Sequence, residues 1–134
     1  MKTDAELMEI HLRMDDARVK GGSARQIATR WHKIIGDLTR EDIGRLKQLS
    51  EKVMELYRQS TKAMRTIAQH LGEHQREMGK NVTVKRLLEH HIAAGNESKH
   101  RILSSLMDQH EAAEQGLRDL GIPESRIGPW RKPR

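Results

Sequence analysis

The histidines are the first residues whose type and spacing could do chemistry. The chain contains 8 His, and His70 and His74 lie four residues apart, which on a helix puts both imidazoles on one face. In an antiparallel hairpin that turns at Asn81-Val82, Glu89 lies opposite His74, and His91 lies at a height between His70 and His74. A metal site built from histidine and carboxylate is one interpretation. A hydrogen-bonded core role for His74 explains the pattern more simply, so we expect no metal and no other cofactor.

Other catalytic signatures are missing from the sequence. The chain has no Cys, which removes disulfides, thiolate zinc sites and cysteine nucleophiles together. It also lacks the glycine-rich nucleotide-binding motif, the phosphate loop and the Gly-x-Ser-x-Gly motif. We therefore expect no catalytic residues and a protein that is not an enzyme.

Basic residues form the second candidate site. The formal net charge is +6. Arg58, Lys62 and Arg65, hereafter the basic stripe, are spaced i, i+4 and i+7, so they form one line along a helix that can follow the phosphates of a nucleic acid. A charged and solvated helix back explains the stripe more simply, because Glu51 and Glu55 interrupt the positive charge.

The end of the chain adds an aromatic ring to further cations, a combination that can dock on nucleic acid or on an acidic protein. The predicted nucleic-acid-binding residues are Arg45, Lys52, Arg58, Lys62, Arg65, Trp130, Arg131, Lys132 and Arg134.

The composition indicates that helices position all of these residues. Only 2% of residues are aromatic and 33% are charged, while Leu, Met, Ala, Glu, Lys, Arg and Gln, which are strong helix formers, are abundant. Thr3 with Glu6 and Ser23 with Gln26 have the capping-box spacing and predict two short helices over 3–20 and 23–36. The second of these has an apolar face made of Ile27, Trp31, Ile34 and Ile35.

The longest predicted helix runs from about residue 40 to 78. It carries a heptad pattern, with apolar residues at most a and d positions, that is typical of a coiled coil or long bundle. The a positions are Ile43, Ser50, Tyr57, Met64, Leu71 and Met78, and the d positions are Leu46, Val53, Ser60, Ile67 and His74.

A second apolar pattern runs from Val84 to Leu120 and predicts the returning arm of an antiparallel hairpin. We expect one continuous helix that is weakened near Gly95, with a break at Gly95-Asn96 as the alternative. A register that pairs Ile43 with Leu120 sets Tyr57 opposite Leu106. The fold class is thus all-α, a long antiparallel helical hairpin preceded by two shorter helices and followed by a flexible basic tail, with segments 1–38, 39–121 and 122–134.

These patterns favour a structural or adaptor protein that acts through helix–helix association. A lone hairpin leaves half of its apolar stripe exposed, so we expect a homo-oligomer. The alternatives are a nucleic-acid-binding protein and a histidine-rich metal-binding bundle. No apolar run reaches the roughly 18 residues of a membrane span. We expect no membrane partner and a cytoplasmic protein, or a virion-associated one if the chain comes from a phage.

Overall fold

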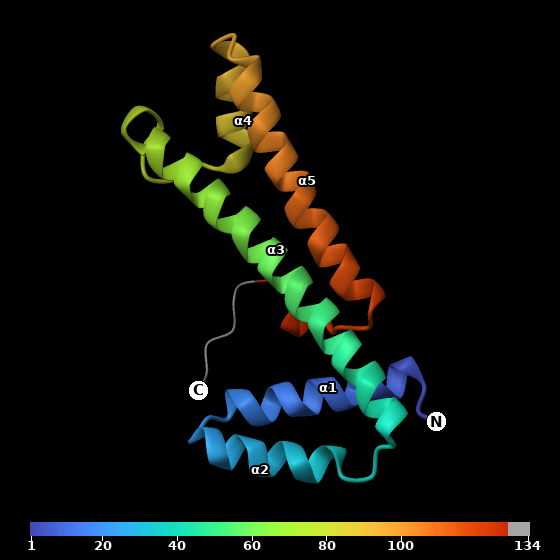
Figure 1. Cartoon of the computed structure of the whole chain (residues 1–134). Helices are drawn as coiled ribbons and strands as arrows, with labels where there is room; N and C mark the ends of the chain where they lie inside the picture. Colours follow the sequence, from blue (N-terminus) through green and yellow to red (C-terminus); the bar gives the residue numbers. More distant parts are fainter. Residues whose placement is uncertain (129–134) are drawn as a thin grey trace. The chain divides into compact units, whose positions relative to one another are not determined.

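The computed structural model describes residues 1–128 of the chain and is helical throughout (Figure 1). Those residues contain no strand, so the all-α prediction is confirmed. None of the helices in this part of the chain combines the length and the hydropathy needed to cross a bilayer. The elements are α1 (Asp4–Val19), α2 (Ala24–Ile35), α3 (Arg40–Met78), α4 (Val84–Ala93), α5 (Glu97–Asp119) and the short 3-10 helix η1 (Glu124–Arg126).

The helices begin where side chains cap them. Thr3 and Ser23 each form a complete capping box, as the sequence predicts. The hydroxyl of Thr39 accepts a hydrogen bond of 3.1 Å from the backbone N–H of Asp42 at the start of α3. Thr83 does the same for Arg86 at the start of α4, over 3.2 Å. These bonds satisfy backbone donors that have no partner inside the helix.

Two compact units make up the described chain. Unit 1 consists of residues 1–55 and 117–128, and unit 2 consists of residues 56–116. Both α3 and α5 continue from one unit into the other. The units follow boundaries different from the segments 1–38, 39–121 and 122–134, and that division stays a prediction.

Unit 1 has a core in which three helices take part. Leu7 and Ile10 from α1 and Leu46 from α3 are buried together, and α2 supplies Ile34 and Ile35 at the edge of this cluster. The α1 residues recur at helical spacing, which puts them on one face.

The segment after α5 also belongs to unit 1. Ile122 is buried, and the guanidinium of Arg126 donates hydrogen bonds to the carbonyl of Leu12 (3.3 Å) and to the carboxylate of Asp16 (2.7 Å) in α1. We expected no regular structure from residue 122 onward. The described part, residues 122–128, instead includes η1 and packs on α1, because Arg126 finds partners in α1 that lie far away in the sequence.

Unit 2 is built on one buried residue from each of three helices: Ile67 in α3, Leu87 in α4 and Leu103 in α5. Figure 1 shows α4 and α5 folding back beside the second half of α3. Ile67 of α3 packs with Leu103 of α5, and Leu56, earlier in α3, packs against Gly116, later in α5. The two helices therefore run antiparallel, as expected for a hairpin.

The continuous helix expected over 84–120 is wrong, because the chain breaks between α4 and α5. Gly95 has a φ of 72°, a left-handed conformation that glycine adopts without steric cost. The N–H of Gly95 donates to Ile92 and that of Asn96 donates to His91, the two bonds of a Schellman motif. The side-chain oxygen of Asn96 then accepts from the N–H of Lys99 and starts α5.

The predicted hairpin register is also wrong. It sets Leu56 opposite Met107, whereas the structure packs the side chain of Leu56 against Gly116, nine residues further along. Met107 is exposed instead. The break at Gly95 separates α4 from α5, so α5 packs on α3 in a register of its own.

The heptad pattern of α3 is only half buried. Every predicted d position is buried: Leu46, Val53, Ser60, Ile67 and His74. The a positions are not, since Ile43 is 41% exposed and Met64 is 44% exposed. The chain therefore buries the d side of the predicted apolar stripe and covers the a side only in part, with Leu71 and Met78 packed against the core of unit 2.

Candidate functional site

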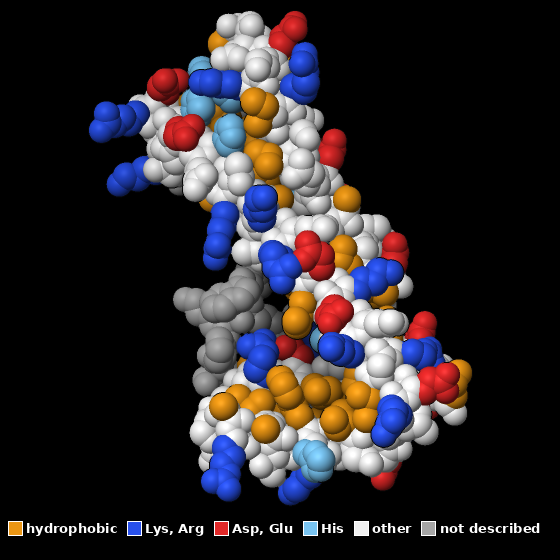
Figure 2. All heavy atoms as spheres, viewed as in Figure 1, with side chains coloured by type: hydrophobic (Ala, Val, Ile, Leu, Met, Phe, Trp, Pro, Cys, Tyr) orange, Lys and Arg blue, Asp and Glu red, His pale blue; other side chains and the backbone are white. Residues whose placement is uncertain are grey.

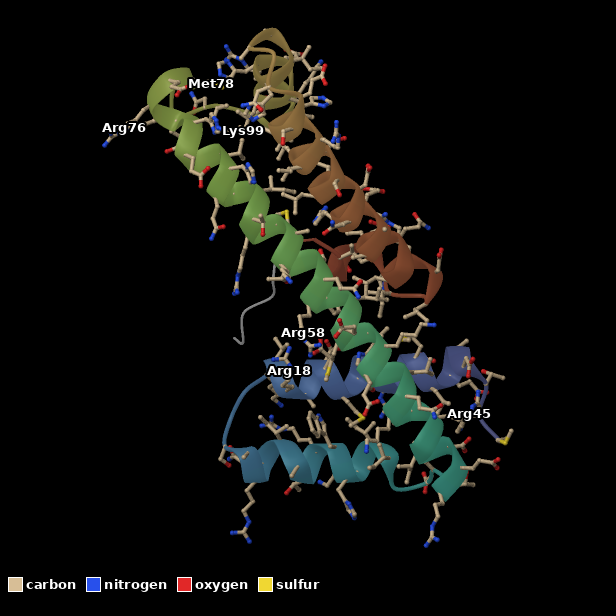
Figure 3. All side chains as sticks on the ribbon, turned by 45° about the horizontal axis from the view of Figure 1, so that its top comes forward. Arg18, Arg45, Arg58, Arg76, Met78 and Lys99 are labelled. Atoms are coloured by element: carbon tan, nitrogen blue, oxygen red, sulfur yellow. The ribbon has the colours of Figure 1, made fainter. Side chains whose placement is uncertain are left out.

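The basic residues predicted to contact phosphates lie in different surroundings. Arg45 is engaged within unit 1: its guanidinium donates to the carbonyl of Lys2 over 2.7 Å and pairs with the carboxylate of Asp4. The N–H of Lys2 in turn donates to buried Asp42 over 3.1 Å. Arg45 thus fastens the start of the chain to α3 (Figure 3).

The other predicted cations on α3 are exposed. Lys52 lies in unit 1, and the basic stripe of Arg58, Lys62 and Arg65 lies in unit 2. Residues 56–72 carry no Asp or Glu, so the acidic residue of α3 nearest the stripe in sequence is Glu55, one helical turn before Arg58. Trp130, Arg131, Lys132 and Arg134 lie outside the described residues.

A histidine cluster lies where α4 packs against α3 in unit 2. It consists of His70 and His74 on α3 and His90 and His91 on α4. The rings of His74 and His91 have centroids 5.0 Å apart and planes at 82°, an edge-to-face contact. His91 is only 2% exposed and His74 only 8%. Pale blue side chains mark histidines in the upper part of Figure 2.

The hydrogen bonds of the cluster are incomplete. Nδ1 of His74 lies 2.9 Å from the carbonyl oxygen of His70, so Nδ1 is the protonated nitrogen of His74. Nε2 of His91 and Nδ1 of His70 are buried without a hydrogen-bond partner. Burial lowers the pKa of His91, and the neighbouring His74, His90, Lys99 and His70 lower it further.

The cluster does not have the arrangement of a metal centre. Within residues 1–128 no group of three or more His, Asp or Glu side chains is placed to hold an ion. The sequence predicted His91 near His74, and the structure brings these two together, while Glu89 is exposed.

The third candidate is an apolar surface on unit 1, hereafter the α2 face: Ile27, Trp31, Ile34 and Ile35. The sequence shows this face by its helical spacing, and the structure shows that all four side chains are partly covered, with Ile34 and Ile35 packed against the core of unit 1. None of the residues of α2 is buried. The indole of Trp31 donates to the carbonyl of Met14 over 2.8 Å, which orients the ring on α1. Figure 2 shows apolar side chains gathered over α1 and α2.

The two helices that carry this surface have opposite charge. α1 contains five acidic residues and two arginines, whereas α2 contains three basic residues and no acidic one. Some of these charges are used internally, since Arg30 donates to the carbonyls of Ala17 and Gly21. On α1, Asp4, Asp15 and Asp16 pair with Arg45, Arg18 and Arg126, so much of its acidic charge is also used within the chain.

Comparison with known proteins gives no relative: no family model, curated protein or solved structure matches the chain.

Proposed function

We propose that the chain is a non-enzymatic helical adaptor that associates with a second copy of itself through the α2 face. The observation that carries the proposal is the half-covered state of this face. Four large apolar side chains recur at helical spacing, yet none of them is buried within its own chain. Each of the four side chains keeps part of its apolar surface in solvent, and contiguous apolar surface that the chain does not bury is typical of an interaction site.

The charge of α1 and α2 supports a second copy as the occupant. In a twofold dimer both partners use the same surface, so an arrangement in which α2 of one copy packs beside α1 of the other is repeated on both sides of the axis. In that arrangement the net positive α2 faces α1, whose formal negative charge is partly neutralised by Arg45 and Arg126 of its own chain. Complementary charge at the rim steers and orients such a contact more than it strengthens it.

Sedimentation equilibrium over a hundredfold range of concentration tests this proposal. The test variant is Ile27→Gln, because Ile27 belongs to the α2 face but not to the buried cluster of unit 1. We expect dimers of the unchanged protein and a weaker dimer of the variant. Loss of about 1.4 kcal/mol of apolar burial corresponds to a tenfold increase in the dissociation constant.

A matched control is Met54→Gln, which replaces an exposed apolar side chain of α3 in the same unit. It should leave the dissociation constant unchanged. The double charge reversal Arg25→Glu, Lys33→Glu should weaken the dimer at low salt and matter less at high salt. A mass that stays monomeric at every concentration would refute the proposal, as would equal effects of Ile27→Gln and Met54→Gln.

Nucleic-acid binding by the basic stripe is the second candidate function. It is favoured by the acid-free stretch 56–72, in which three exposed cations follow one helix. Retention on heparin and titration with duplex DNA at several salt concentrations test it. Replacing Arg58, Lys62 and Arg65 with Ala should reduce the slope of log affinity against log salt by about 0.9 for each lost phosphate contact.

The control for this test removes the same amount of charge from unit 1. Arg25, Lys33 and Arg40 replaced with Ala should change the salt slope much less than the stripe variant. If the unchanged protein fails to bind DNA or RNA at low salt, the positive charge serves solubility or an acidic protein partner instead.

A further inference from the structure

The attachment of α4 depends on a histidine. Only Leu87 and His91 of this helix are buried. Leu87 packs with Ile67 and Leu103 in the core of unit 2, and His91 packs edge to face on His74. Val84 and Leu88 add partly buried contacts to the same core, so one of the two buried residues of α4 can take up a proton.

We propose that the histidine cluster is an acid-sensitive latch: protonation of His91 releases α4 from α3 and opens unit 2. A charged imidazole at this position would be buried next to two further histidines, with its Nε2 lacking an acceptor. Burying a charge without a partner is strongly unfavourable, so the folded unit accepts the proton only by exposing the ring.

None of the groups that shift the pKa of His91 stabilises a positive charge on its ring. From α3 it faces His70 and His74, from its own helix His90, and from α5 Lys99, and each of these opposes a positive charge on His91. Glu77 brings a carboxylate to the edge of the cluster, 3.6 Å from Nε2 of His90. Glu77 therefore pairs with His90, which is more exposed than His91.

The direction of the pH dependence follows from these contacts. The pKa of His91 in the folded chain lies below the value of about 6.5 of an unfolded chain, because burial disfavours the charged ring. The open state thus binds more protons than the closed state, and the closed state loses stability relative to the open one as the pH falls below about 6.5. Each proton taken up on opening raises the opening constant by up to tenfold per pH unit.

Amide hydrogen exchange of the full-length chain between pH 7.5 and 5.5, with EDTA present, tests the latch. After correction for intrinsic exchange, the α4 amides should lose protection by up to about tenfold per pH unit below pH 6.5. NMR titration of the imidazoles should show His91 taking up its proton below the ordinary histidine value. Protection of α4 that does not change with pH would overturn the proposal, and so would a normal or raised pKa for His91.

Variants connect the pH dependence to this residue. His91→Leu keeps an apolar side chain in the site, and its α4 protection should not depend on pH. His32→Gln, at an exposed histidine of α2, should keep the dependence of the unchanged protein. Full pH dependence in His91→Leu would overturn the latch. If His91→Leu does not fold, the exchange and titration of the unchanged protein decide the question by themselves.

Discussion

Gly72 in α3 provides a quantitative test of the unit 2 structure. It is an exposed position inside a 39-residue helix, and a Cβ built there meets no other atom within 4 Å. Glycine inside a helix is less favourable than alanine by about 1 kcal/mol, because it loses more backbone freedom on folding. Gly72→Ala should therefore raise the free energy of unfolding by about 1 kcal/mol.

Gly116 in α5 is the matched comparison. A Cβ at this position lies 3.0 Å and 3.2 Å from the two methyl carbons of Leu56, closer than ordinary van der Waals contact. The alanine gains the same helix preference, but the side chain of Leu56 has to move, and overpacking of this kind typically costs about 1–3 kcal/mol. We expect Gly116→Ala to be neutral or destabilising.

Urea unfolding followed by circular dichroism at 222 nm measures both variants. Gly72→Ala should move the midpoint to higher urea with an unchanged m-value, and a thermal scan should show an increase of about 4 °C. Gly44→Ala gives an independent repeat in unit 1, since its Cβ also meets nothing. If Gly72→Ala is destabilising, or if Gly116→Ala is as stabilising as Gly72→Ala, the packing of α3 and α5 described here is wrong.

Three further predictions concern the two cores. Leu87→Ala should lower the free energy of unfolding by about 2–5 kcal/mol in the same urea assay, because Leu87 is fully buried, and a smaller change would contradict the three-helix core of unit 2. Arg126→Ala removes hydrogen bonds to α1, at a cost of about 1–3 kcal/mol, and should make residues 120–128 more accessible to limited proteolysis, while unchanged cleavage would argue against that docking. His11, which shares a hydrogen bond of 2.8 Å with Ser50, has its pKa lowered chiefly by burial, so unit 1 should lose stability as the pH falls below about 6.5. His11→Gln should flatten this dependence in urea unfolding at pH 7.5 and 5.5, and equal pH dependence in both proteins would show that another group is responsible.

Local features of the fold could be predicted closely. The capping boxes of Thr3 and Ser23 and the cap of Thr39 need only residues three positions apart, so the sequence contains the whole interaction. The positive φ of Gly79 and Gly121 at helix ends follows in the same way from the freedom of glycine. The break at Gly95 had a local signal as well, glycine followed by a capping asparagine, but the continuing apolar pattern outweighed it in the prediction.

The candidate sites were less predictable, because their properties depend on partners distant in the sequence. Arg45 has the same residue type as Arg58, yet the start of the chain engages it with Lys2 and Asp4. The sequence showed the apolar spacing of α2. The solvent exposure of those side chains, however, depends on how closely α1 and α3 pack against them. Burial of this kind is a property of packing and not of spacing.

The sequence by itself determined that the chain is helical, where most helices begin and end, and which face of α3 is apolar, because these depend on contacts within about four residues. Only the tertiary structure decided which half of that apolar face is covered, that Leu56 meets Gly116, and that His91 is buried beside His74. A shift of α5 along α3 leaves every local interaction intact. The register is therefore selected by the packing of side chains between helices, and with it the burial that gives a histidine its pH dependence.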